Sequence, residues 1–264
     1  MADVKGQENG DDAYDMFQEP EDFYQAPKEP TFAEHKLLSG KALKVRLVGH
    51  NPLWGHYLWN AGRTLATYLE EHSEKLVKGR SVLELGAGGG LPSLVAALNG
   101  ASTVVVTDYP DPELIENLAY NIEANSAVRA KGNISAEGYL WGSQVKALFS
   151  YLISDETEST TYADGFDTLI LGDLLFNHSE HSKLVDTILM SMKRSANSVA
   201  LVFFTPYRPW LLQKDLAFFD LARDAGFDVQ KVFEKVMDKV MFEEDPGDEL
   251  LRRTVYGYEL RWKT

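Results

Sequence analysis

The sequence predicts a fold of the α/β class: a seven-stranded, mostly parallel sheet with helices on both faces and an antiparallel hairpin at the C-terminus. Short apolar runs alternate along the chain with longer segments whose apolar residues recur at helical spacing. Such alternation is typical of parallel strands joined by covering helices. In addition, the apolar run at 82–85 leads into glycines at 86, 88, 89 and 90, as expected where a buried strand turns sharply into a helix.

The expected elements follow one another in a regular order. Residues 42–48 alternate as a short strand or an extended covering segment would, and residues 56–76 place apolar side chains on one helical face. The core then comprises strands at 82–85, 103–107, 168–171 and 198–204, a further strand ending at 139–141, and helices at 91–98, 111–125, 180–193 and 211–225. The runs at 227–233 and 254–262 have no helix between them, so we expect them to pair as the antiparallel hairpin.

Length and composition favour one large domain with an N-terminal extension. The chain has 264 residues, of which 44% are hydrophobic. Residues 1–30 carry nine acids against two lysines and lack sustained hydrophobic periodicity. We therefore predict a disordered acidic tail over 1–30 and a single domain over 31–264. Within the tail, the aromatic and acidic island at 16–24 is a candidate docking segment.

The charge of the chain bears on its partners. The formal net charge is −14 and the sequence pI is near 4.9. Because affinity for nucleic acid rests on lysine and arginine contacts with phosphates, we expect no direct nucleic-acid partner. A basic partner is favoured instead, since a field of one sign attracts the opposite sign. An acidic surface that serves solubility alone would explain the charge equally well.

Cysteine content and apolar runs bear on the compartment. The chain has no cysteine, which excludes disulfides, cysteine-based zinc sites and a thiol nucleophile. No apolar run approaches the roughly 20 residues that span a bilayer, and residues 1–12 lack the apolar core of a secretory signal. We expect a cytoplasmic protein without a membrane partner.

The spacing of the glycines distinguishes between two kinds of cofactor site. A dinucleotide-binding turn has the pattern Gly-x-Gly-x-x-Gly. Counted from Gly86 or Gly88, the third glycine position falls on Leu91 or Ser93. The register is instead Glu-x-Gly-x-Gly-x-Gly from Glu84, which resembles the S-adenosyl-L-methionine (SAM) turn of Rossmann-like methyltransferases. Because SAM has no pyrophosphate, no phosphate cradle is required, and we predict SAM as the cofactor.

Two acidic residues follow strand ends on the predicted ligand-binding edge of the sheet. Asp108 lies about 20 residues past the glycine turn, where a carboxylate can accept both ribose hydroxyls of a nucleoside cofactor. The alternative is a helix cap, but Asp111, directly before Pro112, is better placed for that role. Asp173 follows the apolar segment TLILG, so it can orient an incoming amine or serve as a structural cap.

Several aromatic residues are expected near the same edge. Trp141 follows the third strand and can lie along an adenine, or can be an ordinary core residue. Tyr207 follows the fifth strand, and its ring face can hold a cation. Trp54 and Trp59 precede the core, and for Trp54 we favour hydrophobic burial against the leading helix.

No metal site is predicted. His178 and His181 are three residues apart, as helix-borne metal ligands can be, but no further ligand has matching spacing. We interpret both as solvated histidines at the start of a helix. The chain also lacks a Gly-x-Ser-x-Gly elbow and a Gly-Lys-Ser/Thr phosphate loop.

Four segments of the chain carry a resemblance to a known family. LWNAG, VLELGAGGGLPSLVAALNGA, VVVTDYPDPELIENL and LILGDLLFN resemble the class I seven-β-strand methyltransferases, specifically the lysine-methylating methyltransferase-like 21 branch. Within that branch, PLWGHYLWNAG together with TDYPDPEL is similar to the fungal enzymes that methylate translation elongation factor 1-alpha. The resemblance covers residues 40–264. The glycine turn alone identifies only the superfamily, whereas DYPDPEL is far more specific.

The resemblance implies a function and a set of site residues. It implies methylation of the N-terminal glycine and the adjacent lysine of elongation factor 1-alpha. Asp173 is a candidate for positioning the substrate amine, and other catalytic residues stay open. Gly172 departs from the broader branch, in which alanine often precedes this aspartate. The implied cofactor contacts are Trp59, Gly86, Ala87, Gly88, Asp108, Trp141 and, near Asp173, Gly172.

Amine methylation is an in-line displacement, so the protein mainly needs to hold a neutral amine in line with the methyl donor. An α-amino group, with a pKa of about 7.7–8.0, is more often neutral at pH 7 than a lysine near about 10.4. No dedicated general base is evident in the sequence. The acidic loop at 242–245 and the acidic tail are expected to attract a lysine-rich N-terminus.

Two other functions stay open at this stage. One is methylation of a small molecule such as nicotinamide. The other is a non-catalytic adaptor that retains the fold for binding, against which the intact glycine turn and Asp108 argue.

Overall fold

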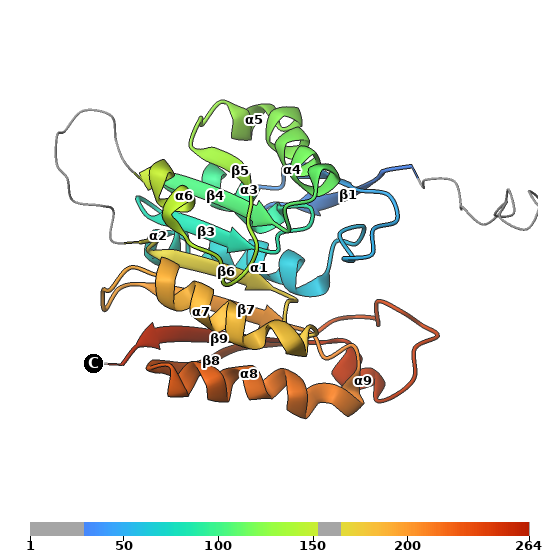
Figure 1. The fold of residues 1–264 in the computed structure, drawn as a ribbon. Coiled ribbons are helices and arrows are strands. Elements are labelled where there is room, and N and C mark those ends of the chain that lie inside the picture. The colour runs from blue at the N-terminus through green and yellow to red at the C-terminus, as the bar shows by residue number, and fades with distance from the viewer. Residues whose placement is uncertain (1–28, 153–164, 264) are drawn as a thin grey trace, which may run out of the picture.

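A seven-stranded sheet forms the middle layer of the protein, as the computed structural model of residues 29–152 and 165–263 shows (Figure 1). The strand order is β5-β4-β3-β6-β7-β9-β8. The first five strands of this order are parallel and the last two pair antiparallel, which confirms the predicted fold class. Their bounds are β3 Ser81–Leu85, β4 Thr103–Asp108, β5 Ile134–Gly138, β6 Thr168–Gly172, β7 Val199–Phe204, β8 Phe227–Val236 and β9 Thr254–Trp262.

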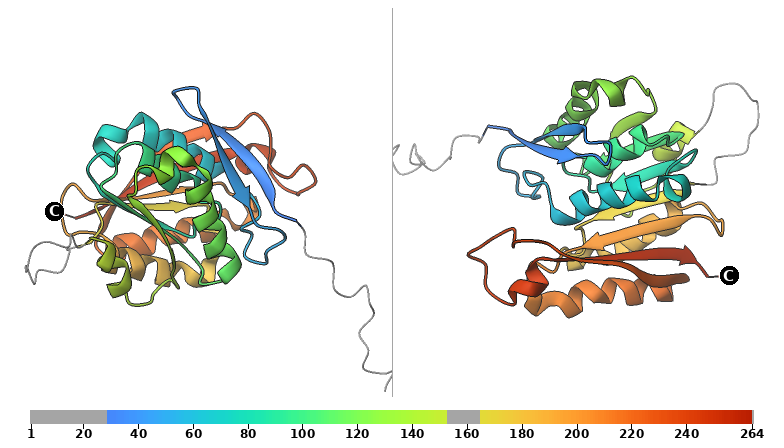
Figure 2. Two further views of the ribbon diagram at one scale, coloured as in Figure 1. Left: turned by 90° about the horizontal axis from the view of Figure 1, so that it is seen from above. Right: turned by 180° about the vertical axis from the view of Figure 1, so that it is seen from behind.

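Helices cover both faces of this sheet (Figures 1 and 2). One face carries α1 (Asn60–Glu71), α2 (Ser73–Leu76), α3 (Leu91–Leu98), α4 (Pro112–Ala124) and α5 (Ser126–Arg129). The opposite face carries α6 (Lys146–Phe149), α7 (His181–Ser191) and α8 (Leu212–Asp224). Short 3₁₀ turns lie at Ser150–Leu152, His178–Glu180 and Pro209–Leu211, and α9 (Glu249–Arg252) precedes β9.

The inner parallel strands β3, β4, β6 and β7 are buried almost along their whole length because both faces of the sheet are covered. In β4, the side chains of Val104 and Val106 enter the core under α1 and α3, while Val105 enters the core under α7 and α8. Successive side chains of a strand point to opposite faces. The continuous runs read from the sequence therefore correspond to fully buried strands.

A separate two-stranded sheet lies over the α1–α3–α4 face (Figure 2). It consists of β1 (Thr31–Lys36) and β2 (Ala42–Leu47), which pair antiparallel. The strand at β2 was predicted, whereas β1 was not. Asn121 of α4 fixes the sheet, because its Oδ1 accepts a 2.7 Å hydrogen bond from the main-chain N–H of Arg46.

Two element predictions need correction. The third core strand ends at Gly138 and not at residues 139–141, because this edge strand is half-buried throughout and carries no apolar run. The helix expected at 56–76 begins at Asn60 and breaks at His72, so that residues 49–59 form a loop. The predicted hairpin of β8 and β9 is present, although the short helix α9 lies between its strands.

The predicted disordered tail falls almost entirely outside the described residues, as do its island at 16–24 and residues 153–164. In the two ranges that the structure covers, no helix combines the length and apolarity needed to cross a bilayer.

Candidate active site

The glycine turn after β3 serves both packing and access. Gly86 has φ of +58°, and a Cβ there would lie 2.6 Å from Leu174 Cδ2 and 3.1 Å from Trp141 Cζ2, so no side chain fits. Gly88 has φ of +54°, and a Cβ there would meet no atom within 4 Å. The turn thus packs tightly at its first glycine and faces open space at its second.

This open space belongs to a cavity of about 540 Å³ at the carboxyl ends of the parallel strands. The cavity lies where the strand order reverses between β3 and β6, the usual ligand position in open α/β sheets. The structure brings all eight predicted site residues to its lining: Trp59, Gly86, Ala87, Gly88, Asp108, Trp141, Gly172 and Asp173. Their contact with a cofactor stays a prediction.

Asp108 is the last residue of β4 and is 9% exposed. Its carboxylate accepts 2.7 Å hydrogen bonds from the main-chain N–H groups of Gly88 and Tyr109. Burial raises the pKa of Asp108, and these two hydrogen bonds act in the opposite direction. The predicted cap of α4 is confirmed at Asp111, which accepts from the N–H of Glu113 at 2.9 Å. Asp108 therefore braces the glycine turn and keeps further lone pairs for a ligand.

Glu84, the fourth residue of β3, is a site residue that sequence analysis used only as part of a motif. Its side chain lines the cavity, and its Oε2 accepts a 2.9 Å hydrogen bond from the N–H of Ser93. Burial raises the pKa of Glu84 to about 8, and nearby Asp108 adds to the increase. Glu84 thus ties the start of α3 to β3 beneath the glycine turn.

Asp173 stands directly after β6 in the left-handed conformation, with φ of +55°. One carboxylate oxygen accepts from the N–H of Ala61 at 2.8 Å, and the other accepts from the N–H of Thr205 at 2.7 Å. The hydroxyl of Tyr207 donates more weakly at 3.5 Å. Burial raises the pKa of Asp173 to about 7, against the opposing effect of these hydrogen bonds. Asp173 therefore joins the start of α1 to the segment after β7.

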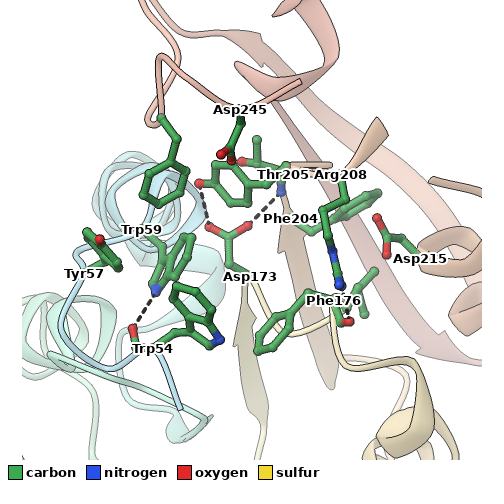
Figure 3. A pocket seen from close by; sticks show the side chains of 13 residues that line it. Trp54, Tyr57, Trp59, Asp173, Phe176, Phe204, Thr205, Arg208, Asp215 and Asp245 are labelled. Atoms are coloured by element: carbon green, nitrogen blue, oxygen red, sulfur yellow. Dashed lines mark hydrogen bonds between the residues drawn. The ribbon is translucent and has the colours of Figure 1, made fainter. Parts of the chain in front are cut away.

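A smaller cavity of about 330 Å³ adjoins the first. Both cavities share the side chains of Trp54, Tyr57, Trp59, Asp173 and Phe176. Figure 3 shows the Asp173 carboxylate pointing toward Thr205, with Trp59 on one side and Asp245 approaching from another loop. The remaining lining residues are Leu175, Phe204, Thr205, Tyr207, Arg208, Asp215, Phe242 and Asp245.

The aromatic rings of the smaller cavity contact one another. The ring of Trp59 lies 5.4 Å from that of Tyr57, 5.1 Å from that of Tyr207 and 5.9 Å from that of Phe242. The predicted burial of Trp54 is wrong: its side chain is 48% exposed and its backbone is left-handed, with φ of +64°. The loop turns at Trp54 so that its carbonyl accepts a hydrogen bond from Trp59 Nε1 at 3.2 Å.

His181 differs from its interpretation as a solvated histidine, whereas the cofactor contact expected near Gly172 stays a prediction. A Cβ at Gly172 would face α1, 3.4 Å from Leu65 Cδ1. His181 is 3% exposed and its Nε2 lies 2.8 Å from the carbonyl of Leu175, so it is not solvated. His178 Nε2 lies 2.7 Å from Asp215 Oδ1. Residues 29–152 and 165–263 contain no group of three or more metal-ligating side chains.

Sequence analysis missed the contributions of Phe176, Asp215 and Arg208 to the smaller cavity. Phe176 lies in the LILGDLLFN segment, three residues after Asp173, and this spacing was an available signal. Asp215 and Arg208 reach the cavity only because the segment after β7 folds back beside β6. Of the acidic loop at 242–245, Phe242 and Asp245 line the cavity, and Glu243 and Glu244 are exposed.

Known proteins resemble this chain in sequence and in fold. Residues 38–223 match the family model described as lysine methyltransferase. The protein named "Protein N-terminal and lysine N-methyltransferase efm7" of Aspergillus fumigatus is 53% identical over 94% of this chain and 93% of its own length. Its namesake in Schizosaccharomyces pombe is 44% identical over 96% and 97%. The crystal structure of TYW2 from Pyrococcus horikoshii in complex with MeSAdo matches the fold with a TM-score of 0.50 at 16% identity, over 90% of this chain and 73% of that chain.

Proposed function

This chain belongs to the lysine methyltransferase family and is a SAM-dependent protein methyltransferase, and we propose that it methylates the N-terminal glycine and the adjacent lysine of translation elongation factor 1-alpha. The double activity on an N-terminal amine and a lysine is carried in the names of the relatives. The elongation factor as acceptor rests on the resemblance of PLWGHYLWNAG and TDYPDPEL. We place this reaction in the cytoplasm, where the elongation factor works.

The residues of the larger cavity fit SAM. Gly88 leaves open space where a Cβ would stand, and Asp108 keeps carboxylate lone pairs for the two sugar hydroxyls. The half-buried indole of Trp141 offers a face for the adenine. When bound, SAM supplies a methyl group on a positively charged sulfur, which needs no further activation.

The observation that carries the proposed acceptor is the chemistry of the smaller cavity. Its walls include aromatic rings, a side-chain type that can attract a cation. Among the described residues, its charged groups are the three carboxylates of Asp173, Asp215 and Asp245 against the one guanidinium of Arg208. It adjoins the larger cavity through Asp173, Trp59 and Phe176. A cationic aliphatic amine that enters from solvent would therefore reach the boundary of the two cavities at Asp173.

Asp173 is placed to orient the amine there. Each of its oxygens accepts one main-chain hydrogen bond, so the carboxylate is fixed. Oδ2 also accepts weakly from the Tyr207 hydroxyl, whereas Oδ1 keeps a further lone pair for the amine. An ammonium must lose a proton before it can attack. The low pKa of an α-amino group, about 7.7–8.0, makes that loss easier than for lysine. We assign Asp173 to positioning.

The acidic loop adds attraction at the mouth of the cavity. Glu243, Glu244 and Asp245 are exposed consecutive acids beside the lining residue Phe242. Fields of this sign draw in a lysine-rich N-terminal segment and lose strength as salt is raised.

The proposal is tested by incubating the protein with labelled SAM and elongation factor 1-alpha that has a free N-terminal glycine, followed by mass spectrometry of its first peptide. We expect label on the α-amine and on the adjacent lysine. The matched control is the same factor with an acetylated N-terminus, which should retain only the lysine label. Nicotinamide is assayed in parallel, and label on nicotinamide with none on the factor would replace the proposed acceptor by a small molecule.

A further inference from the structure

One arginine, Arg252, is buried outside both cavities, and the proposed reaction does not explain why an arginine stands there. Arg252, the last residue of α9, is 7% exposed. No carboxylate of the described residues lies within ion-pair distance of its guanidinium, and its Nε has no hydrogen-bond partner. Its Nη1 donates a 2.7 Å hydrogen bond to the main-chain carbonyl of Phe242. Because a buried, unpaired charge is costly, the contact with Phe242 is the feature that accounts for an arginine at this position.

Phe242 occupies a central place in the aromatic wall of the smaller cavity. Its ring lies 5.2 Å from that of Tyr57, 5.9 Å from that of Trp59 and 5.9 Å from that of Tyr207, all in edge-to-face geometry. Those three rings come from the segment before α1 and the segment after β7. Of these four rings, only Phe242 comes from the loop between β8 and β9, so it completes the aromatic wall of the cavity from the C-terminal part of the chain.

This loop, residues 237–248, has little other support. Its first residue is held by Arg253, whose main chain accepts from the N–H of Met237 at 2.8 Å and whose Nη1 donates to the carbonyls of Met237 and Asp238. Its last residue, Asp248, caps α9. Between these ends, over residues 239–247, the described chain shows one side-chain hydrogen bond, the one from Arg252.

We propose that Arg252 is a positioning residue for the methyl acceptor: by holding the Phe242 carbonyl, it fixes the ring that closes the acceptor cavity. This rests on the proposed function of that cavity. The effect falls on the acceptor and not on SAM, because Phe242 and Asp245 line the smaller cavity and neither lines the larger one.

The test is a double-mutant cycle of Arg252→Met and Phe242→Ala with elongation factor 1-alpha as acceptor. We expect each single variant to raise the acceptor KM about tenfold. Arg252→Met loses one hydrogen bond from a charged group, and Phe242→Ala loses the ring that this bond positions. The SAM Kd, measured by calorimetry, should stay within about twofold, and the double variant should be no worse than Phe242→Ala, because both changes act through one ring. Arg223→Gln, an exposed arginine of α8, is the charge-matched control and should leave KM unchanged.

Additive KM effects, an unchanged KM, or a SAM Kd that rises in parallel would each overturn the proposal. If Arg252→Met does not fold, Arg252→Lys replaces it. Lysine can donate one hydrogen bond without the planar fork of arginine, so we expect a KM between those of wild type and Phe242→Ala. A KM for Arg252→Lys equal to that of wild type or beyond that of Phe242→Ala counts equally against it.

A second measurement tests the positioning role of Arg252 independently of the proposed acceptor. Tetramethylammonium chloride is titrated into the wild-type and variant proteins, and the fluorescence of Trp54 and Trp59, which line the cavity, is followed. Weaker binding to the Arg252 and Phe242 variants supports the positioning role even if wild-type protein does not methylate the elongation factor, in which case only the acceptor assignment fails. Equal binding by all proteins contradicts the positioning role.

Discussion

The two adjoining cavities of the site are built by different means. The larger one combines the glycine turn and the ends of β3, β4 and β6 with aromatic side chains such as Trp59 and Trp141. The smaller one has no such turn and is walled mainly by large side chains from segments far apart in sequence: 54–59, 173–176, 204–208 and 242–245, together with Asp215. On the proposed function, the donor side therefore includes a local sequence motif, whereas the acceptor side depends on the assembled fold. Substitutions should therefore separate the two functions.

The largest expected effect is on the donor side, at Asp108. Asp108→Asn keeps the shape but removes the charge that holds the Gly88 N–H and that, on the proposed function, would accept the sugar hydroxyls. We expect the SAM Kd to rise about a hundredfold, since hydrogen bonds to charged groups contribute about 1.5–3 kcal/mol each. Calorimetry measures this directly.

The control for Asp108 is Asp111→Asn, three residues away. Asn is as good a helix cap as Asp, so the cap of α4 survives and the SAM Kd should not change. Equal losses in the two variants would mean that general acidity, and not the position of Asp108, governs SAM binding.

The next effect concerns stability, at Glu84 beneath the glycine turn. Its pKa is raised from 4.5 to about 8 in the folded protein, so between these values the folded state holds a proton that the unfolded state has released. The contribution of Glu84 to the free energy of unfolding is therefore fully present below pH 4.5 and is lost as the pH rises toward 8. From pH 5.5 to 7 the loss attributable to Glu84 is about 2 kcal/mol.

Urea unfolding at both pH values measures this loss. In Glu84→Gln the free energy of unfolding should decline less over the same interval, because glutamine does not titrate. Asp173, whose pKa is about 7, contributes a decline of the same sign to both proteins. Parallel declines in wild type and Glu84→Gln would show that Glu84 is ionised when folded.

At the boundary between the cavities, Asp173→Asn should act on the acceptor side. We expect kcat/KM for the acceptor to fall about tenfold while the SAM Kd changes by less than about twofold, because one charged hydrogen bond to the amine is lost. Asp167→Asn is the control. Asp167 directly precedes β6 and accepts hydrogen bonds from the N–H and hydroxyl of Ser81, at the end of the sheet away from the cavities. Its substitution therefore tests stability without changing a cavity residue. A loss of SAM binding as large as the loss of kcat/KM would place Asp173 on the donor side.

The smallest effect is expected from the acidic loop. Neutralising Glu243, Glu244 and Asp245 together to Gln, Gln and Asn should raise the acceptor KM severalfold, and the difference from wild type should shrink as salt is raised. The SAM Kd should be unchanged. A triple variant with equal charge loss at Asp220, Asp224 and Asp228, exposed acids of α8 and β8, is the control. If both triple variants raise KM equally, net charge and not the loop attracts the acceptor.

The same division explains what the sequence could predict. Helix 91–98 and its glycine turn were predicted to the residue, because Gly86 and Gly88 are required by the local backbone and the helix is apolar on all sides. The edge strand β5 was misplaced because its half-exposed sequence, ISAEG, has no apolar run. The eight predicted site residues converge on one cavity because carboxyl ends of parallel strands meet at one edge.

The acceptor wall resisted prediction for a physical reason. Trp54 was expected to be buried, since burial is the common fate of tryptophan, but a left-handed turn directs it outward. Phe242 and Arg252 lie ten residues apart, and no periodicity links them. Their contact exists only because the loop after β8 folds back over α9 and toward the N-terminal segment.

The most direct test of the whole account is a crystal structure with S-adenosylhomocysteine, the demethylated donor. We expect both ribose hydroxyls within hydrogen-bond distance of the Asp108 carboxylate, the ligand beside the Gly86–Gly88 turn, and its sulfur directed toward Asp173 and the smaller cavity. A ligand bound away from Asp108, or one whose sulfur points away from the aromatic cavity, would contradict the division of the site into a donor and an acceptor side.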